Sequence, residues 1–382
     1  MNILMLNVTS DLYGSSKILY YVARTLKKRG FNITLVLSYE GPLANLFRND
    51  GFDVVIIRLG ILRKRYFNFL GIFNRSIVLL MASRKLFKLC KDKKIDLIYS
   101  NTTPVIVGGI ISKILNLKHI WHLHEIFEPR LSFVHKFFGL FINYTSDLVI
   151  VVSKAVYENW VDLIMSSKLV IIQNGIPLDD YNNHSSNLRE ELKIDSNTKL
   201  IAMIGRVNTY KGQKYYLEIA SHLIKKIKNI KFLLVGDAFK GYEYLYSEIQ
   251  KYIEDLDLSE YVIDLGYRED IVNILPSIDL LILPSLKPDP FPTIILEAMA
   301  SSKAVIATRQ GGALEQIEDG VTGKFIPFDN PLLCSEIIFD VITSKSILNF
   351  FGANAKSRVE KYFSLNDYER RINDLFDKNI SV

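Results

Sequence analysis

Short apolar runs that alternate with helical stretches constrain the fold of this chain more than any other feature. The runs are nearly continuous in Ile, Val and Leu, which is typical of parallel strands covered by helices on both faces. They are residues 2–8, 32–38, 53–59, 96–101, 119–125 and 147–153, then 199–205, 231–237, 261–266, 279–285 and 304–308. Between the first two, Lys17 to Arg29 has apolar residues at helical spacing and is followed by Gly30. The sequence therefore predicts an α/β protein built from strand–helix–strand units.

A chain of 382 residues is long enough for two domains of common size. The polar stretch from Asp179 to Asn187 has no apolar period, and we interpret it as the connection between them. We therefore predict two doubly wound domains, residues 1–178 and 179–365, that face each other across a cleft. Residues 366–380 carry a helical apolar stripe, and one hypothesis is that they pack back onto the first domain.

Composition excludes several protein classes. Apolar content near half with modest charge is typical of a folded globular protein. Cys90 and Cys334 are too far apart in the sequence to indicate a disulfide framework or a metal site, which fits a reducing compartment. The first residues lack the features of a signal peptide, and polar residues, Pro104 and glycines interrupt the longest uncharged run, Leu97 to Ser112. We expect a cytoplasmic protein.

Charge is uneven along the chain. Residues 1–180 hold 23 Lys and Arg against 13 Asp and Glu, a net charge of +10, whereas residues 181–382 hold 24 against 28, a net charge of −4. A basic first half indicates an anionic substrate or surface, although a lysine-rich solvated surface explains it equally well. Because the basic residues are not accompanied by an aromatic or groove-reading motif, we expect no nucleic-acid partner.

The segment from Lys287 to Ala300 follows the apolar run 279–285. Three of its first six residues are prolines, so we expect a stiff loop and a helix that begins near Thr293 with its free N–H groups pointing outward. Such a helix end attracts anions. Asp289 and Glu297 flank it, and acids that complement the helix dipole explain this stretch about as well as a functional site does.

Two cations follow the strand predicted at 199–205. Arg206 and Lys211 are five residues apart in one loop, so both are able to converge on the same group. An Arg fork with a Lys point charge suits a diphosphate. The alternative is a pair of solvated loop cations.

Other candidates also follow predicted strands. Gly14 and Ser15 form a glycine–serine turn before the first helix, which alone is a weak signal for a ligand, and the absence of G-x-G-x-x-G argues against nicotinamide or flavin. His122 and His124 lie on one face of a strand beside Glu125. A metal site, a structural role and a ligand contact all remain open for these histidines.

Taken together, these residues resemble glycosyltransferase family 4, whose members are retaining, nucleotide-sugar-dependent enzymes of the GT-B architecture with two Rossmann-like domains. The resemblance covers nearly the whole chain and is densest from Arg206 to Gly323. The E-x7-E motif of the family appears here as Asp289 and Glu297, with the first acid shortened.

The resemblance assigns roles to individual residues. It implies that Arg206 and Lys211 hold the donor diphosphate in place of a metal ion, so no cofactor is expected. Amides near three further residues would help them: Phe291, Pro292 and Thr293.

On the sugar side, the resemblance implies that Glu297 bonds the ribose hydroxyls and Asp289 the hydroxyls of the donor sugar. His124 matches the family histidine beside the transferred sugar. Gly14 and Ser15 stand where the family has paired glycines.

The resemblance implies transfer of a sugar to a glycan or lipid-linked acceptor in capsule, O-antigen or exopolysaccharide synthesis. A mixture of cations and apolar groups in the first half suits an anionic membrane surface, and peripheral contact there is a hypothesis. These residues are Arg63, Lys64, Arg65, Tyr66 to Phe73, Arg84, Lys85, Lys88, Lys91, Lys93 and Lys94.

Two other functions remain alternatives. A nucleotide-sugar epimerase of the same architecture would need no acceptor. A non-catalytic nucleotide-sugar-binding protein would bind without turnover.

Overall fold

The computed structural model describes residues 1–61, 68–181, 185–238 and 241–380. The chain forms two compact units, Met1–Asn174 together with Asn366–Val382, and Gly175–Leu365. The division after Asn174 lies four residues before the predicted boundary at 178. The stretch interpreted as a connection falls in the second unit, where Asp179–Tyr181 forms a turn of 3-10 helix.

In the described residues of the first unit, seven parallel strands form one sheet in the order β3-β2-β1-β4-β5-β6-β7. The six predicted runs are confirmed as strands. The seventh strand was missed because its apolar run, Leu169 to Ile172, has only four residues, whereas the runs that predicted strands have five to seven. The strands are β1 Asn2–Asn7, β2 Asn32–Leu37, β3 Asp53–Ile56, β4 Leu97–Asn101, β5 Lys118–Leu123, β6 Leu148–Val151 and β7 Leu169–Ile171.

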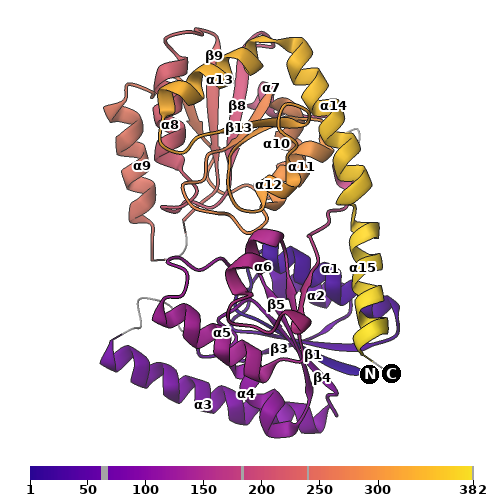
Figure 1. Ribbon diagram of the computed structural model, residues 1–382. Coiled ribbons are helices and arrows are strands. Elements are labelled where there is room, and N and C mark those ends of the chain that lie inside the picture. The colour runs from indigo at the N-terminus through magenta and orange to yellow at the C-terminus, as the bar shows by residue number, and fades with distance from the viewer. Residues whose placement is uncertain (62–67, 182–184, 239–240, 381–382) are drawn as a thin grey trace. The chain divides into compact units, whose positions relative to one another are not determined.

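Helices cover both faces of this sheet (Figure 1). They are α1 Gly14–Lys28, α2 Pro42–Asn49, α3 Phe69–Asp92, α4 Ile106–Leu115, α5 Phe133–Thr145, α6 Lys154–Trp160 and α15 Leu365–Asn379. The C-terminal helix α15 lies against the end of α1. Lys28 donates to Glu369 at 2.9 Å, and the rings of Phe31 and Phe376 are 6.2 Å apart. The chain end is therefore part of the first unit.

The described residues of the second unit form a six-stranded parallel sheet in the order β10-β9-β8-β11-β12-β13. Its strands are β8 Lys199–Ile204, β9 Ile230–Val235, β10 Val262–Asp264, β11 Leu280–Leu283, β12 Ala304–Thr308 and β13 Gly323–Ile326, the last of which was not predicted. Its helices are α7 Leu188–Glu191, α8 Gln213–Leu223, α9 Tyr244–Asp255, α10 Ile271–Ser277, α11 Thr293–Ala300, α12 Ala313–Gln316, α13 Pro331–Thr343 and α14 Lys345–Tyr362.

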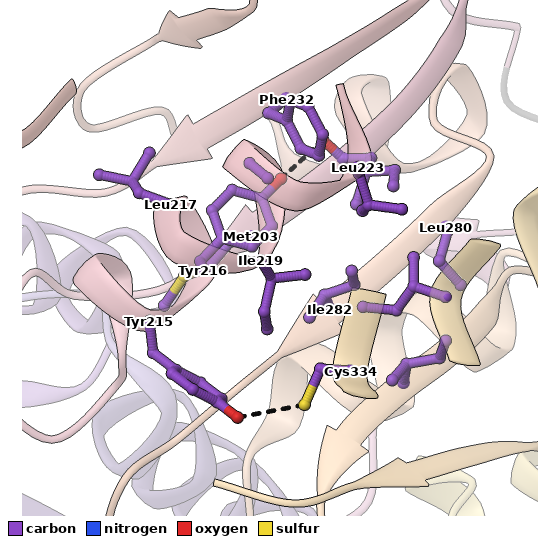
Figure 2. Packing of buried hydrophobic residues seen from close by; sticks show 14 of the residues in the cluster. Met203, Tyr215, Tyr216, Leu217, Ile219, Leu223, Phe232, Leu280, Ile282 and Cys334 are labelled. Carbon is purple, nitrogen blue, oxygen red and sulfur yellow. Dashed lines mark hydrogen bonds between the residues drawn. The ribbon is translucent and has the colours of Figure 1, made fainter. Parts of the chain in front are cut away.

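Tyrosines of α8 help to close the core of this unit (Figure 2). Tyr216 is fully buried, and its hydroxyl donates to the carbonyl of Ile201 on β8 at 2.9 Å. The Tyr215 hydroxyl lies 3.1 Å from Sγ of Cys334 on α13. Because both hydroxyls have partners, the rings contribute apolar area without leaving a polar atom unsatisfied.

Counted within each unit, the strand order of the second sheet is 3-2-1-4-5-6, and the first sheet has the same order with a seventh strand added after the sixth. The direction of winding reverses between β1 and β4 in the first sheet and between β8 and β11 in the second. Ligands of open α/β sheets bind beyond the carboxyl ends of the strands at such a switch point. The fold therefore places one candidate site in each unit.

Candidate active site

In the second unit, the loops that follow β8 and β11 pack against each other at the switch point. Gly212 has φ +84°, and a Cβ there would lie 2.0 Å from the carbonyl oxygen of Pro284. The amide of Leu286 donates to the carbonyl of Tyr210 at 2.7 Å. Only a glycine allows this approach, so the cation-bearing loop is fixed against the proline-rich loop.

This packing brings together two of the predicted site residues. Lys211 donates to the carboxylate of Asp289, and their side chains are only 23% and 15% exposed. Asn208 accepts from the backbone N–H of Lys211 at 2.9 Å, which orders the loop around the lysine. The carbonyl of Arg206 accepts from Gln213 at 3.0 Å, so this residue is fixed through its backbone.

Helix α11 begins at Thr293, as the sequence predicts, and no side chain caps its first turn. The N–H of Ile295 donates to the carbonyl of Pro292 at 3.3 Å, so the N–H groups of Thr293 and Ile294 are the ones available to an anion. Proline has no N–H, so Pro292 itself offers only its carbonyl, which accepts from Gln316 at 3.0 Å. Of the three residues, Phe291 and Thr293 carry an amide, and the ring of Phe291 is buried 5.8 Å from that of Phe363.

Glu297 lies in the second turn of α11 and is 5% exposed. Two glycines after β12 contact the backbone of the loop that contains Asp289. A Cβ on Gly311 would lie 2.3 Å from the carbonyl oxygen of Asp289, and the N–H of Gly312 donates to that same oxygen at 2.7 Å. Because these two residues have no side chain, the segment after β12 is able to pack directly against the backbone of the Asp289 loop.

A pocket that sequence reasoning missed opens beside β8 and β9. Its lining includes Gly205, Gly236, Tyr246 and Asp264. Burial, together with the hydrogen bond to Asp264, raises the pKa of the Tyr246 hydroxyl. The sequence feature that could have indicated this pocket is that Gly205 and Gly236 each directly follow a strand.

In the first unit, a chain of hydrogen bonds joins the ends of β1, β4 and β5. The amide nitrogen of Asn101 donates to Oδ1 of Asn7 at 2.9 Å and to the carbonyl of Ser15 at 3.3 Å. Oδ1 of Asn101 lies 2.9 Å from Nε2 of His124. The structure thus connects the predicted residues Ser15 and His124 through Asn101, which the sequence did not single out. The sequence feature that could have identified Asn101 is its position as a polar residue at the end of an apolar strand.

Helix α1 starts at Gly14 and not at Lys17, so the predicted glycine–serine turn is itself the first turn of the helix. The N–H groups of Ser16 and Lys17 both donate to the carbonyl of Tyr13, at 2.9 and 3.0 Å. Gly14 and Ser15 are therefore placed at the helix N-terminus, where backbone N–H groups favour negative charge.

The two strand-end histidines are adjacent but differ in exposure. His122 is fully buried, its Nδ1 lies 2.8 Å from the hydroxyl of Tyr99, and its ring centroid is 4.1 Å from that of His124. Burial lowers the pKa of His122 well below its usual range and that of His124 to about 3. Both rings are therefore neutral at neutral pH.

Glu125 is engaged by its neighbours. Its carboxylate accepts from the N–H and the hydroxyl of Thr103, at 3.1 and 2.7 Å, and from the N–H of His124 at 3.1 Å. Burial raises the pKa of this carboxyl against the effect of these bonds. Over the ranges that the structure describes, no three His, Cys, Asp or Glu side chains gather to share a metal ion.

Comparisons with known proteins cover both units. The family model Glycosyltransferase Family 4 matches residues 13–180, and the model Glycosyl transferases group 1 matches residues 185–358. The lipopolysaccharide 1,2-N-acetylglucosaminetransferase of Salmonella typhimurium is 28% identical over 69% of this chain and 68% of its own length. The UDP-Gal:alpha-D-GlcNAc-diphosphoundecaprenol alpha-1,3-galactosyltransferase of Escherichia coli is 24% identical over 92% of this chain and 90% of its own length.

A solved structure agrees with these relatives. Anabaena Alr3699/HepE, crystallised with UDP and glucose, superposes with a TM-score of 0.87 at 25% identity and covers 98% of this chain and 99% of its own. Both units have parallel Rossmann-like sheets with polar residues at the switch points, as the matched family models and relatives lead us to expect. The chain belongs to glycosyltransferase family 4.

Proposed function

We propose that this glycosyltransferase moves a sugar from a nucleoside-diphosphate sugar to a glycan or lipid-linked acceptor, with retention of anomeric configuration and without a metal ion. The observation that carries the proposal is the pairing of Lys211 with Asp289 beside the uncapped start of α11. The names of the relatives support a UDP-sugar donor and a role in surface polysaccharide assembly, such as capsule, O-antigen or exopolysaccharide synthesis.

The cations and the helix end match the charge that the reaction develops. Breaking the bond between the sugar C1 and the phosphate oxygen leaves negative charge on the diphosphate. Arg206, Lys211 and the N–H of Thr293 supply positive charge to stabilise it, which is the role that a metal ion would otherwise fill. In the retaining step, the acceptor oxygen bonds to C1 on the face from which the phosphate departs, and the acceptor proton passes to that phosphate.

The carboxylates select the donor in this proposal. Glu297 accepts from the ribose hydroxyls and Asp289 from hydroxyls of the sugar, because ionised carboxylates are acceptors only. When donor binds, the diphosphate competes with Asp289 for Lys211. His124 contacts a hydroxyl of the substrate.

A thermal-shift panel of nucleotide sugars tests donor binding, because a ligand at 100 times its dissociation constant adds about 2.7 kcal/mol of stability. Transfer assays with the selected donor should then show a product of retained configuration by NMR and an unchanged rate in EDTA. Glu297→Ala is expected to abolish transfer without changing the circular dichroism spectrum. A wild-type rate in this variant would contradict the assignment.

The same assays separate the alternatives. An epimerase would convert the donor without any acceptor, so donor incubated alone is the discriminating sample. A binding protein would give a thermal shift but no product with any acceptor.

We also propose that the first unit contacts an anionic membrane. Of the cationic and apolar segment predicted for this role, residues 62–67 lie outside the described residues, and Lys93 pairs with Asp53 at 2.7 Å. Helices α3, α4 and α5 are neighbours in the first unit (Figure 1). They carry a set of exposed large apolar side chains. These are Phe73, Ile77, Leu80, Met81, Ile114, Phe133, Phe137, Leu140 and Tyr144.

The spacing on these helices supports membrane contact. On α5 the exposed residues recur every three or four positions, which makes one continuous stripe. On α3 the stripe Phe73, Ile77 and Leu80 continues at the same spacing into exposed cations at Arg84, Lys88 and Lys91. No Asp or Glu occurs from Phe69 to Lys91, in α4 or in α5. An apolar stripe with only positive charge is the combination that binds anionic bilayers at their surface. Throughout the described residues, every helix is too short or too polar to span a bilayer.

A further inference from the structure

Two backbone carbonyls fix the direction of the hydrogen-bond chain in the first unit. Asn7 and Asn101 are buried, at 1% and 0% exposed. The side-chain amide of Asn7 contacts the carbonyl of Thr9 at 2.9 Å, and a carbonyl only accepts, so the atom facing it is the nitrogen. Oδ1 of Asn7 therefore faces Asn101 and accepts from it.

The same reasoning orients Asn101. Its side-chain atom near the carbonyl of Ser15 must be the nitrogen, which also donates to Asn7. The remaining atom, Oδ1, lies 2.9 Å from Nε2 of His124 and is able only to accept. Nε2 of His124 must then carry the proton of this bond.

The groups around His124 keep the ring neutral. The neutral ring of His122 is 4.1 Å away between centroids. Glu125 directs its carboxylate to the backbone N–H of His124 and to Thr103. Desolvation lowers the pKa of His124 to about 3. A neutral imidazole has one proton, so protonation at Nε2 leaves Nδ1 as an acceptor.

We propose that Asn101 is a positioning residue that holds His124 in the Nε2–H tautomer and so presents Nδ1 as a hydrogen-bond acceptor for a substrate hydroxyl. Among the described residues, Nδ1 makes no hydrogen bond, and the His124 side chain is partly exposed. The proton on Nε2 follows from the buried asparagines, and the unprotonated Nδ1 follows from the neutrality of the ring. Only its use on a substrate hydroxyl rests on the proposed function.

Nitrogen NMR of the histidine side chains tests the tautomer without substrate. The chain has six histidines, so a protein labelled with ¹⁵N-histidine gives few signals, and His124→Gln assigns the relevant pair. We expect one protonated nitrogen at Nε2 and one unprotonated nitrogen at Nδ1 at pH 7. A wild-type signal from the Nδ1–H tautomer or from imidazolium would overturn the proposal, whether or not any variant folds.

Two substitutions at the partner separate positioning from general support. Asn101→Leu removes the acceptor, and we expect mixed tautomers for His124 with kcat/KM lowered about tenfold. Asn101→Asp places a carboxylate beside Nε2 and should move the titration of His124 upward, because an opposite charge favours imidazolium. Unchanged His124 shifts in the folded leucine variant would refute the positioning role. If wild type shows the expected tautomer but no sugar is transferred, the tautomer stands and the proposed function fails.

Discussion

Lys211 and Asp289 form an ion pair between two loops that follow the neighbouring strands β8 and β11. Both side chains are largely buried. Gly212 lets the loop of Lys211 approach the carbonyl of Pro284, and Gly311 approaches the backbone of Asp289. The ion pair and the loop contacts therefore fix both side chains at the switch point. Under the proposed function, such order reduces the entropy cost of binding the donor.

Substitutions at this ion pair should affect the stability of the protein and its transfer activity differently. Lys211→Met leaves Asp289 without its cation and is expected to lower stability by about 1 kcal/mol, and Asp289→Asn in addition should restore most of that loss. Transfer is expected to fall about a hundredfold or more in both variants, because both lack the cation that we propose stabilises the leaving diphosphate. Thermal unfolding and initial rates measure the two effects. A double variant that regains transfer would show that the lysine has only a structural role.

The glycine after β12 offers a test of the loop contact. Gly311→Ala places a Cβ 2.3 Å from the carbonyl of Asp289 at φ +61°, so the loop must shift. We expect a loss of at least about 1 kcal/mol in stability and weaker donor binding. Gly320→Ala is the matched control, because its φ is +76° but nothing lies within 4 Å of the added Cβ. Equal effects on donor binding would rule out a specific role for the Gly311 contact.

Strand positions were predictable because buried parallel strands leave continuous apolar runs. Strands β7 and β13 were not, since the apolar runs that contain them, Leu169 to Ile172 and Phe325 to Ile326, are shorter than the runs of five to seven residues that predicted the other strands. Helix α11 was located at its first residue because prolines forbid a helix before Thr293.

The candidate residues were predictable where a strand end carries a charged or ring side chain. Asn7 and Asn101 were not, because each stands alone in the sequence, 94 residues apart, and gains meaning only when β1 pairs with β4. The ion pair of Lys211 with Asp289 likewise depends on the adjacency of β8 and β11. Sequence spacing within one loop does not contain that information.

Burial of His119 should make the first unit sensitive to acid. Its Nδ1 donates to the carbonyl of Thr145 at 3.0 Å, its Nε2 lies 2.9 Å from the Ser100 hydroxyl, and burial lowers its pKa from 6.5 to about 4. Below pH 6.5, His119 becomes protonated in the unfolded chain but stays neutral in the folded chain. Its contribution to stability is therefore complete above pH 6.5 and is lost as pH falls toward 4. The loss from this residue is about 3 kcal/mol.

Tryptophan fluorescence during urea unfolding measures this effect in the right unit. The two tryptophans, Trp121 and Trp160, both lie in the first unit, and the ring of Trp121 is 5.0 Å from that of His119. His119→Gln should reduce the slope between pH 4 and 6.5 without abolishing it, because burial also lowers the pKa of His122 and His124 in the same unit. The control is His222→Gln in α8 of the second unit, which holds no tryptophan, and the slope reported by the tryptophans should match wild type. A slope unaltered by the first substitution would contradict the assignment to His119.

The exposed stripe on α5 should contribute to membrane binding. Phe133 and Leu140 are 86% and 61% exposed, so replacing both with serine removes apolar area without opening the core. We expect binding to vesicles containing anionic lipid to weaken at least about tenfold in a sedimentation assay. The matched control replaces Leu332 and Phe350 of the second unit, which are 50% and 53% exposed, and should bind as wild type does.

The cations at the end of the α3 stripe give the electrostatic half of the same prediction. Arg84→Glu with Lys88→Glu reverses two exposed charges, and each basic residue near an anionic surface is worth about 1 kcal/mol, so binding should fall more than tenfold and lose much of its salt dependence. Transfer to a soluble acceptor should stay near the wild-type rate, because neither residue lies at a switch point. Wild-type protein that binds neutral and anionic vesicles equally at low salt would refute the electrostatic contact, and dimer formation through the stripe would show that its occupant is a second copy of the chain.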